Sequence, residues 1–377
     1  MTARRGIAVV IGTRPEAIKL APVVRELAAR RGPLRPVVVL TAQHRELTDE
    51  VLRTFRIRAD HDLDVMRPDQ TLFETTSAIL TGLGELYARV RPAAVLVQGD
   101  TTTALAGALA AFYRRIPVGH VEAGLRTGDR WNPWPEEMNR HLVSALADYH
   151  FAPTPRARDA LIAENVPRRA IHVTGNTVVD ALQAILADRR DAPPRALRAL
   201  EAGLAGQALI VVTAHRRESW GRTLGEIAHA IRDIVAREPR AVVVFPVHPN
   251  PNVARAVRPV LEGRPRIHLI APLDYASFVR LMARATLIIT DSGGIQEEAP
   301  TLRVPVLVVR KTSERPEGAA AGVLKVVGTD RRRLVREALA LLRSPARRAR
   351  MTTRRNPYGD GRAAERIVNI LEREVGG

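Results

Sequence analysis

The stretch VVIGTRPEAIKLAPVVREL, residues 9–27, is the first strand–turn–helix unit of this chain and sets the pattern for the rest. An apolar strand runs into a short Gly-Thr-Arg-Pro-Glu turn, and a helix that carries Lys19 follows. Lysine is rare here, since only three of the 58 basic residues are lysine. The unit therefore raises the question of what Arg14, in the turn, and Lys19, in the helix, bind.

The alternation of apolar and longer amphipathic segments recurs along the 377 residues. The expected strands are IAVVIG, RPVVVLT, AAVLVQGD, IPVGHVEAG, YHFAPT and IHVTGN and, after the proline-rich DAPPRALRAL, ALIVVTAH, AVVVFPVH, IHLIAP, TLIITDSGG and VPVLVVR. Two runs of βαβ units predict an α/β protein with two parallel sheets and helices on both faces of each. We expect an N-terminal domain over 1–178, a C-terminal domain over 179–360, and a terminal helix over 361–377 that packs back on the first domain.

The composition excludes several classes of protein. There is no cysteine, which rules out a disulfide framework, a cysteine metal site and a thiol nucleophile, and is compatible with a reducing cytosol. The apolar runs fall short of the roughly 18 residues of a membrane helix, and the run at residues 7–11 is too short for a signal peptide. We therefore expect a soluble, cytoplasmic protein without membrane insertion.

The formal net charge of +18 suggests nucleic-acid binding, because basic faces release counterions from phosphate backbones. The basic residues are, however, scattered over helix faces together with 40 carboxylates. The densest basic run, residues 330–355, has leucines at helical spacing, which is typical of a solvated amphipathic face. We predict no specific nucleic-acid partner, and weak binding to duplex DNA that disappears at physiological salt.

Polar residues end several of the expected strands, and ligands of parallel sheets bind beyond the carboxyl ends of the strands. Asp100, Glu122 and His215 each end a strand, as do Asp291 and Ser292 together. Any one of them alone is equally explained as a turn or helix cap. Because several such endings converge, they predict a binding site.

The segment TDSGGIQEE is the clearest phosphate signal in the sequence. Two glycines let the backbone approach an anion, and the following helix offers free N–H groups and the positive end of its dipole. Glu298, one turn into that helix, suits the hydroxyl donors of a ribose better than a phosphate. A nucleoside diphosphate satisfies both features, and a glycine-rich turn with a capping serine is the alternative.

Other cofactors lack a signature in the sequence. No G-x-G-x-x-G follows a strand, so a nicotinamide cofactor has no evident site. His120 and Glu122 share one strand face, but no third ligand is implied nearby, which favours a core histidine over a metal ligand. We predict neither a metal nor a cofactor.

The segment HVEAGLRTGDRWNPWPEEMNRHL, together with GTRPEAIK, QGDTTT, TAHRRES, TDSGGIQEEAP and ERPE, resembles the non-hydrolysing UDP-N-acetylglucosamine 2-epimerases. The motifs occur in the family order from Gly12 to Glu317. The resemblance implies a glycosyltransferase-B-like fold, in which two Rossmann-like domains face each other across a cleft that holds the UDP-sugar. It also implies a cytoplasmic homodimer that interconverts UDP-N-acetylglucosamine (UDP-GlcNAc) and UDP-N-acetylmannosamine (UDP-ManNAc) without metal or redox cofactor, for cell-surface polysaccharide.

The resemblance also implies roles for individual residues. The catalytic set is Asp100, Glu122, Glu136 and His215. The residues for UDP are Arg14, Lys19, Phe278, Ser292, Gly293, Gly294, Glu298 and Arg315. Only the resemblance separates Glu136 from its neighbour Glu137, because a carboxylate in the first turn of a helix is ordinarily a dipole partner. Which carboxylate is the base in each direction stays open, as does a relay role for His215 beside that of holding the diphosphate.

Some members of this family bind a second UDP-GlcNAc as an activator. The matching positions are Gln43, His44, Glu136, Arg216 and His248. Glu46 and Asp69 depart from the pattern, since a glutamine and an arginine would be expected there, and each adds negative charge beside an anionic ligand. Whether this chain keeps the activator site therefore stays open.

Two alternatives use the same UDP site. A UDP-sugar glycosyltransferase would need an acceptor and would not need both HVEAG and PWPEE. A hydrolysing epimerase would release free N-acetylmannosamine, and such enzymes resemble this chain less at HVEAG. The products formed from UDP-GlcNAc alone separate these possibilities.

Overall fold

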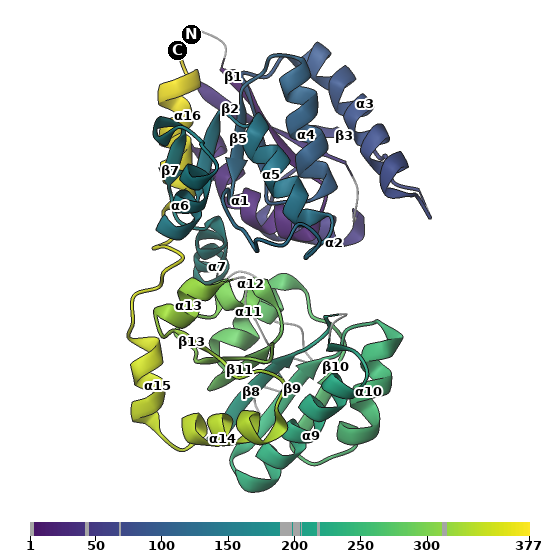
Figure 1. The fold of residues 1–377 in the computed structure, drawn as a ribbon, viewed down its shortest axis with the longest axis vertical. Coiled ribbons are helices and arrows are strands. Elements are labelled where there is room, and N and C mark those ends of the chain that lie inside the picture. Colours follow the sequence, from purple (N-terminus) through teal and green to yellow (C-terminus); the bar gives the residue numbers. More distant parts are fainter. Residues whose placement is uncertain are drawn as a thin grey trace. The chain divides into compact units, whose positions relative to one another are not determined.

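The computed structural model describes residues 4–41, 45–67, 69–188, 198, 204, 206–216, 219–310 and 315–377. The chain divides into two compact units (Figure 1). Unit 1 comprises Met1–Ala184 and Tyr358–Gly377, and unit 2 comprises Ile185–Pro357. The sequence had placed these divisions after residues 178 and 360.

Unit 1 is built on a seven-stranded sheet in which all strands run parallel. The strand order is β3-β2-β1-β4-β5-β6-β7. The strands are β1 (Arg5–Ile11), β2 (Leu34–Leu40), β3 (His61–Asp62), β4 (Ala94–Gln98), β5 (Val118–Val121), β6 (Tyr149–Ala152) and β7 (Ile171–Val173). The apolar runs that predicted these strands are buried, as expected for a sheet covered on both faces.

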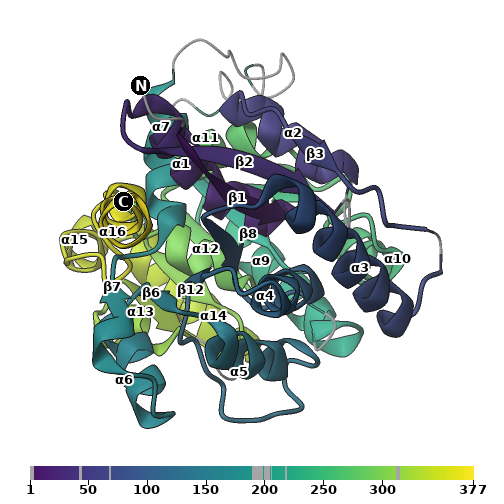
Figure 2. The same ribbon diagram turned by 90° about the horizontal axis from the view of Figure 1, so that it is seen from above.

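Helices cover both faces of this sheet. They are α1 (Arg14–Ala29), α2 (Arg45–Phe55), α3 (Leu72–Val90), α4 (Thr102–Tyr113), α5 (Glu136–Leu146), α6 (Pro155–Ala163), α7 (Thr177–Ala187) and α16 (Ala363–Val375), with a 3₁₀ turn at Arg168–Ala170. Successive side chains of a strand point to opposite faces, so Ala8 and Val10 of β1 share a core with Leu83 of α3 and Ala104 of α4. Helices α3, α4 and α5 lie in a row on that face (Figures 1 and 2).

Unit 2 repeats the same architecture with a six-stranded parallel sheet in the order β10-β9-β8-β11-β12-β13. The strands are β8 (Ala208–Thr213), β9 (Ala241–Pro246), β10 (Ile267–Ile270), β11 (Leu287–Thr290), β12 (Val306–Val308) and β13 (Leu324–Val326). The helices are α9 (Arg222–Arg237), α10 (Pro251–Leu261), α11 (Tyr275–Ala283), α12 (Gly293–Glu298), α13 (Pro316–Ala320), α14 (Arg331–Leu342) and α15 (Pro345–Thr352). The two-sheet α/β prediction is confirmed.

Each sheet reverses its strand order once, which fixes where a ligand binds. In unit 1 the chain moves from β1 outward to β3 and then returns to the other side of β1 as β4. In unit 2 it moves from β8 to β10 and returns beside β8 as β11. Ligands of such sheets bind beyond the carboxyl ends of the two strands at this switch. The turns at these points carry Gly12 and Asp100 in unit 1, and His215 and Asp291 in unit 2.

The C-terminal helix α16 is part of unit 1 and packs on α1. Arg30 donates to Asn369 at 2.7 Å and to Glu372 at 2.8 Å. The side chain of Asp180 accepts the backbone N–H groups of Ala363 and Ala364, at 3.2 and 2.8 Å, and so satisfies two donors at the start of α16.

Every strand expected from the sequence is present, and two further strands were missed. Strands β3 and β13 contain only two and three residues, too few for an alternating pattern to be recognised. Within the described ranges, no helix is both long and apolar enough to cross a bilayer.

Candidate functional site

The turn between β1 and α1 is held by its own residues. A Cβ added to Gly12 would lie 2.1 Å from Thr103 Oγ1 and 2.6 Å from Thr41 Oγ1, so only glycine fits there. Glu16, at the third position of α1, accepts the N–H groups of Gly12 and Thr13 at 2.8 and 2.6 Å in a capping box. These contacts fix the half-buried Arg14 at the first position of the helix.

Glu16 also joins this turn to the turn after β4. Its second oxygen accepts the hydroxyl of Thr101 at 2.5 Å, and Thr101 caps α4 and follows Asp100. Burial raises the pKa of Glu16 to about 7, although hydrogen bonds from Thr101, Gly12 and Thr13 act in the opposite direction. The two turns at the switch point of unit 1 thus share one buried carboxyl group.

We expect Glu16 to make stability depend on pH. Because its folded pKa of about 7 exceeds the ordinary 4.5, the native protein binds more protons than the unfolded chain between these values. The contribution of Glu16 to the free energy of unfolding should therefore fall by about 3 kcal/mol as pH rises from 4.5 to 7. Glu16→Gln lacks this titration, so urea denaturation of both proteins from pH 4.5 to 8 measures it. If the free energies of unfolding of the wild type and Glu16→Gln differ by the same amount at every pH, this expectation is wrong.

Glu122 lies just beyond β5 and receives three side-chain donors. One oxygen is paired with Lys19 Nζ and accepts Asn176 Nδ2 at 2.9 Å, and the other accepts Gln98 Nε2 at 2.5 Å. The carboxylate is only 8% exposed, so these donors stabilise its negative charge where water cannot. Sequence reasoning assigned Lys19 to the diphosphate and did not identify Gln98 or Asn176. Gln98 ends a strand, a position that could have drawn attention to it.

Asp100 lies on the turn after β4 and is held by α5. Its Oδ2 accepts Arg140 Nε at 2.8 Å, with Arg140 Nη2 at 2.6 Å, and its backbone carbonyl accepts Asn139 Nδ2 at 2.8 Å. The preceding Gly99, which adopts φ +70°, also accepts a bond from buried His120 at 2.8 Å. Asn139 and Arg140 were missed from the sequence, because neither ends a strand.

His120 behaves as the structural histidine that its sequence context favoured. Burial lowers its pKa to about 3, so the ring is neutral, and its Nε2 lies on the Gly99 carbonyl. Across the ranges that the structure describes, no cluster of three or more His, Asp or Glu side chains could hold a metal ion.

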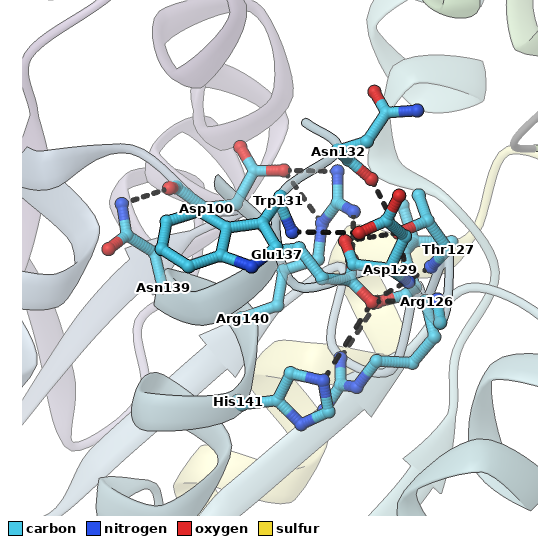
Figure 3. A network of polar contacts seen from close by, with 12 residues as sticks. Asp100, Arg126, Thr127, Asp129, Trp131, Asn132, Glu137, Asn139, Arg140 and His141 are labelled. Atoms are coloured by element: carbon cyan, nitrogen blue, oxygen red, sulfur yellow. Dashed lines mark hydrogen bonds and ion pairs between the residues drawn. The ribbon is translucent and has the colours of Figure 1, made fainter. Parts of the chain in front are cut away.

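Glu136 and Glu137, at the start of α5, differ sharply in their contacts, and Figure 3 shows those of Glu137. Glu137 is 1% exposed, accepts the N–H groups of Thr127 and Gly128 at 2.9 and 3.0 Å, and is paired with Arg140 at 2.7 Å. Glu136 Oε2 is buried and has no hydrogen-bond partner among the described residues. A buried carboxylate oxygen without a donor is expected to meet a ligand or water. Glu137 is therefore occupied by the loop, whereas Glu136 is available.

In unit 2, Asp291 organises the switch point. This fully buried residue follows β11 and accepts the backbone N–H groups of His215 and Arg216 at 2.8 and 2.9 Å. The His215 ring lies 3.6 Å, Nδ1 to Oδ1, from Asp291 and stacks on His248 with ring centres 5.3 Å apart. Burial, followed by the neighbouring His215, lowers the pKa of His248. The structure thus brings together His215 with Arg216 and His248, two of the positions matched to an activator site.

The Ser-Gly-Gly segment lies between two arginines of the same unit. A Cβ placed on Gly293 would lie 3.3 Å from Arg216 Nη2 and 3.5 Å from Arg315 Cζ. Arg315 is 8% exposed and donates to buried Glu297 at 2.7 Å. A Cβ on Gly294 would meet only Ser292 Oγ, at 3.9 Å. The backbone at the start of α12 therefore lies beside two cationic side chains, which suits a phosphate group.

The remaining predicted nucleotide residues lie on α11 and α12. Glu298 is 7% exposed and accepts the Tyr275 hydroxyl at 3.3 Å. Phe278, three residues after Tyr275 in α11, is half-buried. Gln43 and His44, two of the positions matched to an activator, lie outside the described residues.

Comparisons of the sequence and of the structure with known proteins all indicate the same enzyme family. A family sequence model described as UDP-N-acetylglucosamine 2-epimerase matches residues 25–372. The UDP-N-acetylglucosamine 2-epimerase of Escherichia coli (strain K12) is 50% identical, covering 96% of this chain and 97% of that protein. The solved structure of a putative UDP-N-acetylglucosamine 2-epimerase from Listeria monocytogenes is 44% identical with a TM-score of 0.91, over 98% of this chain and 96% of that one. The enzyme from Neisseria meningitidis bound to UDP-GlcNAc is 42% identical with a TM-score of 0.88, over 98% and 100%.

Proposed function

The chain belongs to the UDP-N-acetylglucosamine 2-epimerase family, and we propose how its residues interconvert UDP-GlcNAc and UDP-ManNAc. It is a non-hydrolysing epimerase, an isomerase that inverts C2 of the sugar. The observation that carries our assignment is the cluster at the unit 1 switch point, where Glu122 has three donors, Asp100 is held by α5 and Glu136 keeps a buried oxygen without a partner.

The chemistry requires a proton to leave C2 and another to arrive on the opposite face. C2 is not adjacent to a carbonyl, so its hydrogen is too weakly acidic for simple removal and return. If the bond from C1 to the diphosphate breaks as a base takes the C2 proton, the C–H electrons form a C1=C2 double bond and UDP leaves as an anion. The product is 2-acetamidoglucal. UDP then adds back at C1 while an acid protonates C2 from the other face.

We assign the proton transfers to Asp100, Glu122 and Glu136. Carboxylates in different environments can act as an acid and a base near neutral pH. Glu122 is paired with Lys19 and receives hydrogen bonds from Gln98 and Asn176, whereas Glu136 Oε2 lacks a donor in the described structure. These differences support distinct roles for the two groups on opposite faces of C2.

We assign the nucleotide to unit 2 together with Arg14 and Lys19 of α1. The backbone of Ser292, Gly293 and Gly294 would bind the diphosphate, with Arg315 nearby, because cations and helix N-termini stabilise a departing phosphate. The ribose hydroxyls would donate to Glu298, and Phe278 would line the uracil. His215, beside Asp291, would hold the leaving oxygen. Lys19 is also paired with the Glu122 carboxylate.

We further propose that the protein works as a homodimer in the cytoplasm and supplies surface-polysaccharide synthesis. Exposed aromatic side chains support an association surface on unit 1, since Phe112 and Tyr113 at the end of α4 are 56% and 67% exposed. Sedimentation analysis of the purified protein measures its oligomeric state. A monomer at micromolar concentration would contradict the proposed homodimer.

The function is tested with UDP-GlcNAc as the only substrate, in EDTA and without added NAD. We expect UDP-GlcNAc to equilibrate with UDP-ManNAc, because the elimination route needs neither a metal nor a redox step. NMR identifies and quantifies the two sugar nucleotides. Free N-acetylmannosamine as the main product would indicate a hydrolysing enzyme instead. Strict dependence on a metal would also overturn the mechanism.

A further inference from the structure

We propose that Arg140 is a positioning residue for this reaction, which fixes Asp100 and, through Glu137, the segment that leads into Glu136. The inference rests on the proposed function of the two carboxylates. Arg140 does not follow a strand, so its position in the sequence did not mark it as a site residue. Its side chain lies in the middle of the polar network in Figure 3. Arg140 is 6% exposed, so its charge is stabilised by protein groups in place of water.

The guanidinium group binds two carboxylates at once. Nε and Nη2 lie 2.8 and 2.6 Å from Asp100 Oδ2, and Nη1 donates to Glu137 Oε2 at 2.7 Å. Among the described residues, the hydrogen bond and ion pair to the Asp100 side chain both reach Oδ2, and the second oxygen points away from Arg140 (Figure 3). Arg140 therefore orients Asp100 by one oxygen and leaves the other for the substrate.

Glu137 connects Arg140 to the loop before α5. Burial by itself would raise the pKa of Glu137, but hydrogen bonds from the Gly128 and Thr127 N–H groups and from Arg140 lower it. The ionised side chain thereby anchors the loop at 127–128 to the first turn of α5. Glu136, the residue immediately before it, takes its position from that anchored turn.

Lysine could not replace Arg140 in this arrangement. The planar guanidinium presents several N–H groups in a fixed fork, whereas an ammonium is a single point charge on a flexible stem. Arg140 uses three nitrogens in two directions. Asn139, the preceding residue of α5, binds the Asp100 backbone at 2.8 Å, so the helix holds both the main chain and the side chain of Asp100.

The first test is Arg140→Lys, which keeps the charge and removes the fork. We expect kcat to fall roughly 10²-fold, because misplacement of a catalytic group by about 1 Å has that effect. KM and the Kd of UDP should stay within about twofold, since uniform binding is not altered. The second variant is Arg140→Ala with added guanidinium chloride at millimolar concentration. A saturable recovery of kcat is expected, and a purely structural role would not produce it.

Arg126→Lys is the matched control. Arg126 lies just before residues 127–128 of the anchored loop and forms a two-bond pair with Glu164 at 2.7 Å. In the described structure no hydrogen bond or ion pair joins it to Asp100 or Glu136. We expect its kcat to stay within about threefold of the wild type, because loss of a partly exposed pair changes stability more than catalysis. Guanidinium should not raise its activity. Equal losses of kcat in Arg140→Lys and Arg126→Lys would overturn the positioning role.

Folding and function are monitored separately. If Arg140→Ala does not fold, as shown by its thermal unfolding, Arg140→Lys decides the question alone, and kcat within about threefold of the wild type would overturn the proposal. If the wild-type protein forms no UDP-ManNAc, the proposed function fails by itself. Crystal structures of the wild type and Arg140→Lys would then decide the positioning role, which requires the Asp100 carboxylate to shift in the variant and fails if it does not.

Discussion

Glu122→Gln and Glu136→Gln should each lower turnover by roughly 10²–10⁴-fold, the contribution of a positioned acid or base. Glutamine keeps the shape of the side chain but cannot exchange a proton with C2. In Glu122→Gln the amide oxygen can still accept Asn176 Nδ2, but the amide NH₂ then faces Gln98 Nε2, so the Gln98 amide must turn to keep a hydrogen bond. The ion pair with Lys19 is lost. UDP affinity should change much less, because most residues assigned to UDP belong to unit 2.

The measurement combines kinetics with isotope exchange in heavy water. Elimination through a glucal replaces the C2 hydrogen, so both epimers should gain deuterium at C2 in the wild-type reaction, and each variant should slow this exchange together with turnover. Glu164→Gln is a suitable control, because that carboxylate is paired with Arg126 and has no role in the proposed proton transfers. Retention of the original C2 hydrogen through epimerisation, or near-normal turnover in both glutamine variants, would refute the mechanism.

Gly294→Val should abolish tight UDP binding while leaving the protein folded. A Cβ at this position meets only Ser292 Oγ, at 3.9 Å, so a side chain can leave the backbone here without a close contact at its first atom. It would nevertheless cover the backbone that we assign to the diphosphate. Loss of a hydrogen bond to a charged group costs about 1.5–3 kcal/mol, so the Kd of UDP should rise roughly 10- to 150-fold.

The control for this substitution is Gly225→Val in α9, where a Cβ meets no atom within 4 Å. It introduces the same side chain into a helix of the same unit, outside the Ser-Gly-Gly segment. Calorimetric titration with UDP should give an unchanged Kd for Gly225→Val. If Gly294→Val binds UDP as tightly as this control, the diphosphate does not lie on the Ser-Gly-Gly backbone.

Local patterns in the sequence were enough to predict both sheets and to select the strand-end residues that we propose for the site. Strands such as β1 and β8 are continuous apolar runs, and the polar residue after each strand marks the edge where parallel strands end. Asp100, Glu122 and His215 were found in this way. The Ser-Gly-Gly segment was recognised because a close backbone approach requires glycine, which is also a local property.

Only the tertiary structure decided which side chains meet. Lys19 and Glu122 are 103 residues apart in the chain, Asn176 and Glu122 are 54 apart, and Arg140 and Asp100 are 40 apart. Sequence periodicity places a residue on a face of its own element, but these partners depend on the register in which separate elements pack. Glu136 and Glu137 are neighbours with the same local propensity, and they differ because the buried one is satisfied by the loop and Arg140, while the other keeps an oxygen without a partner in the described structure.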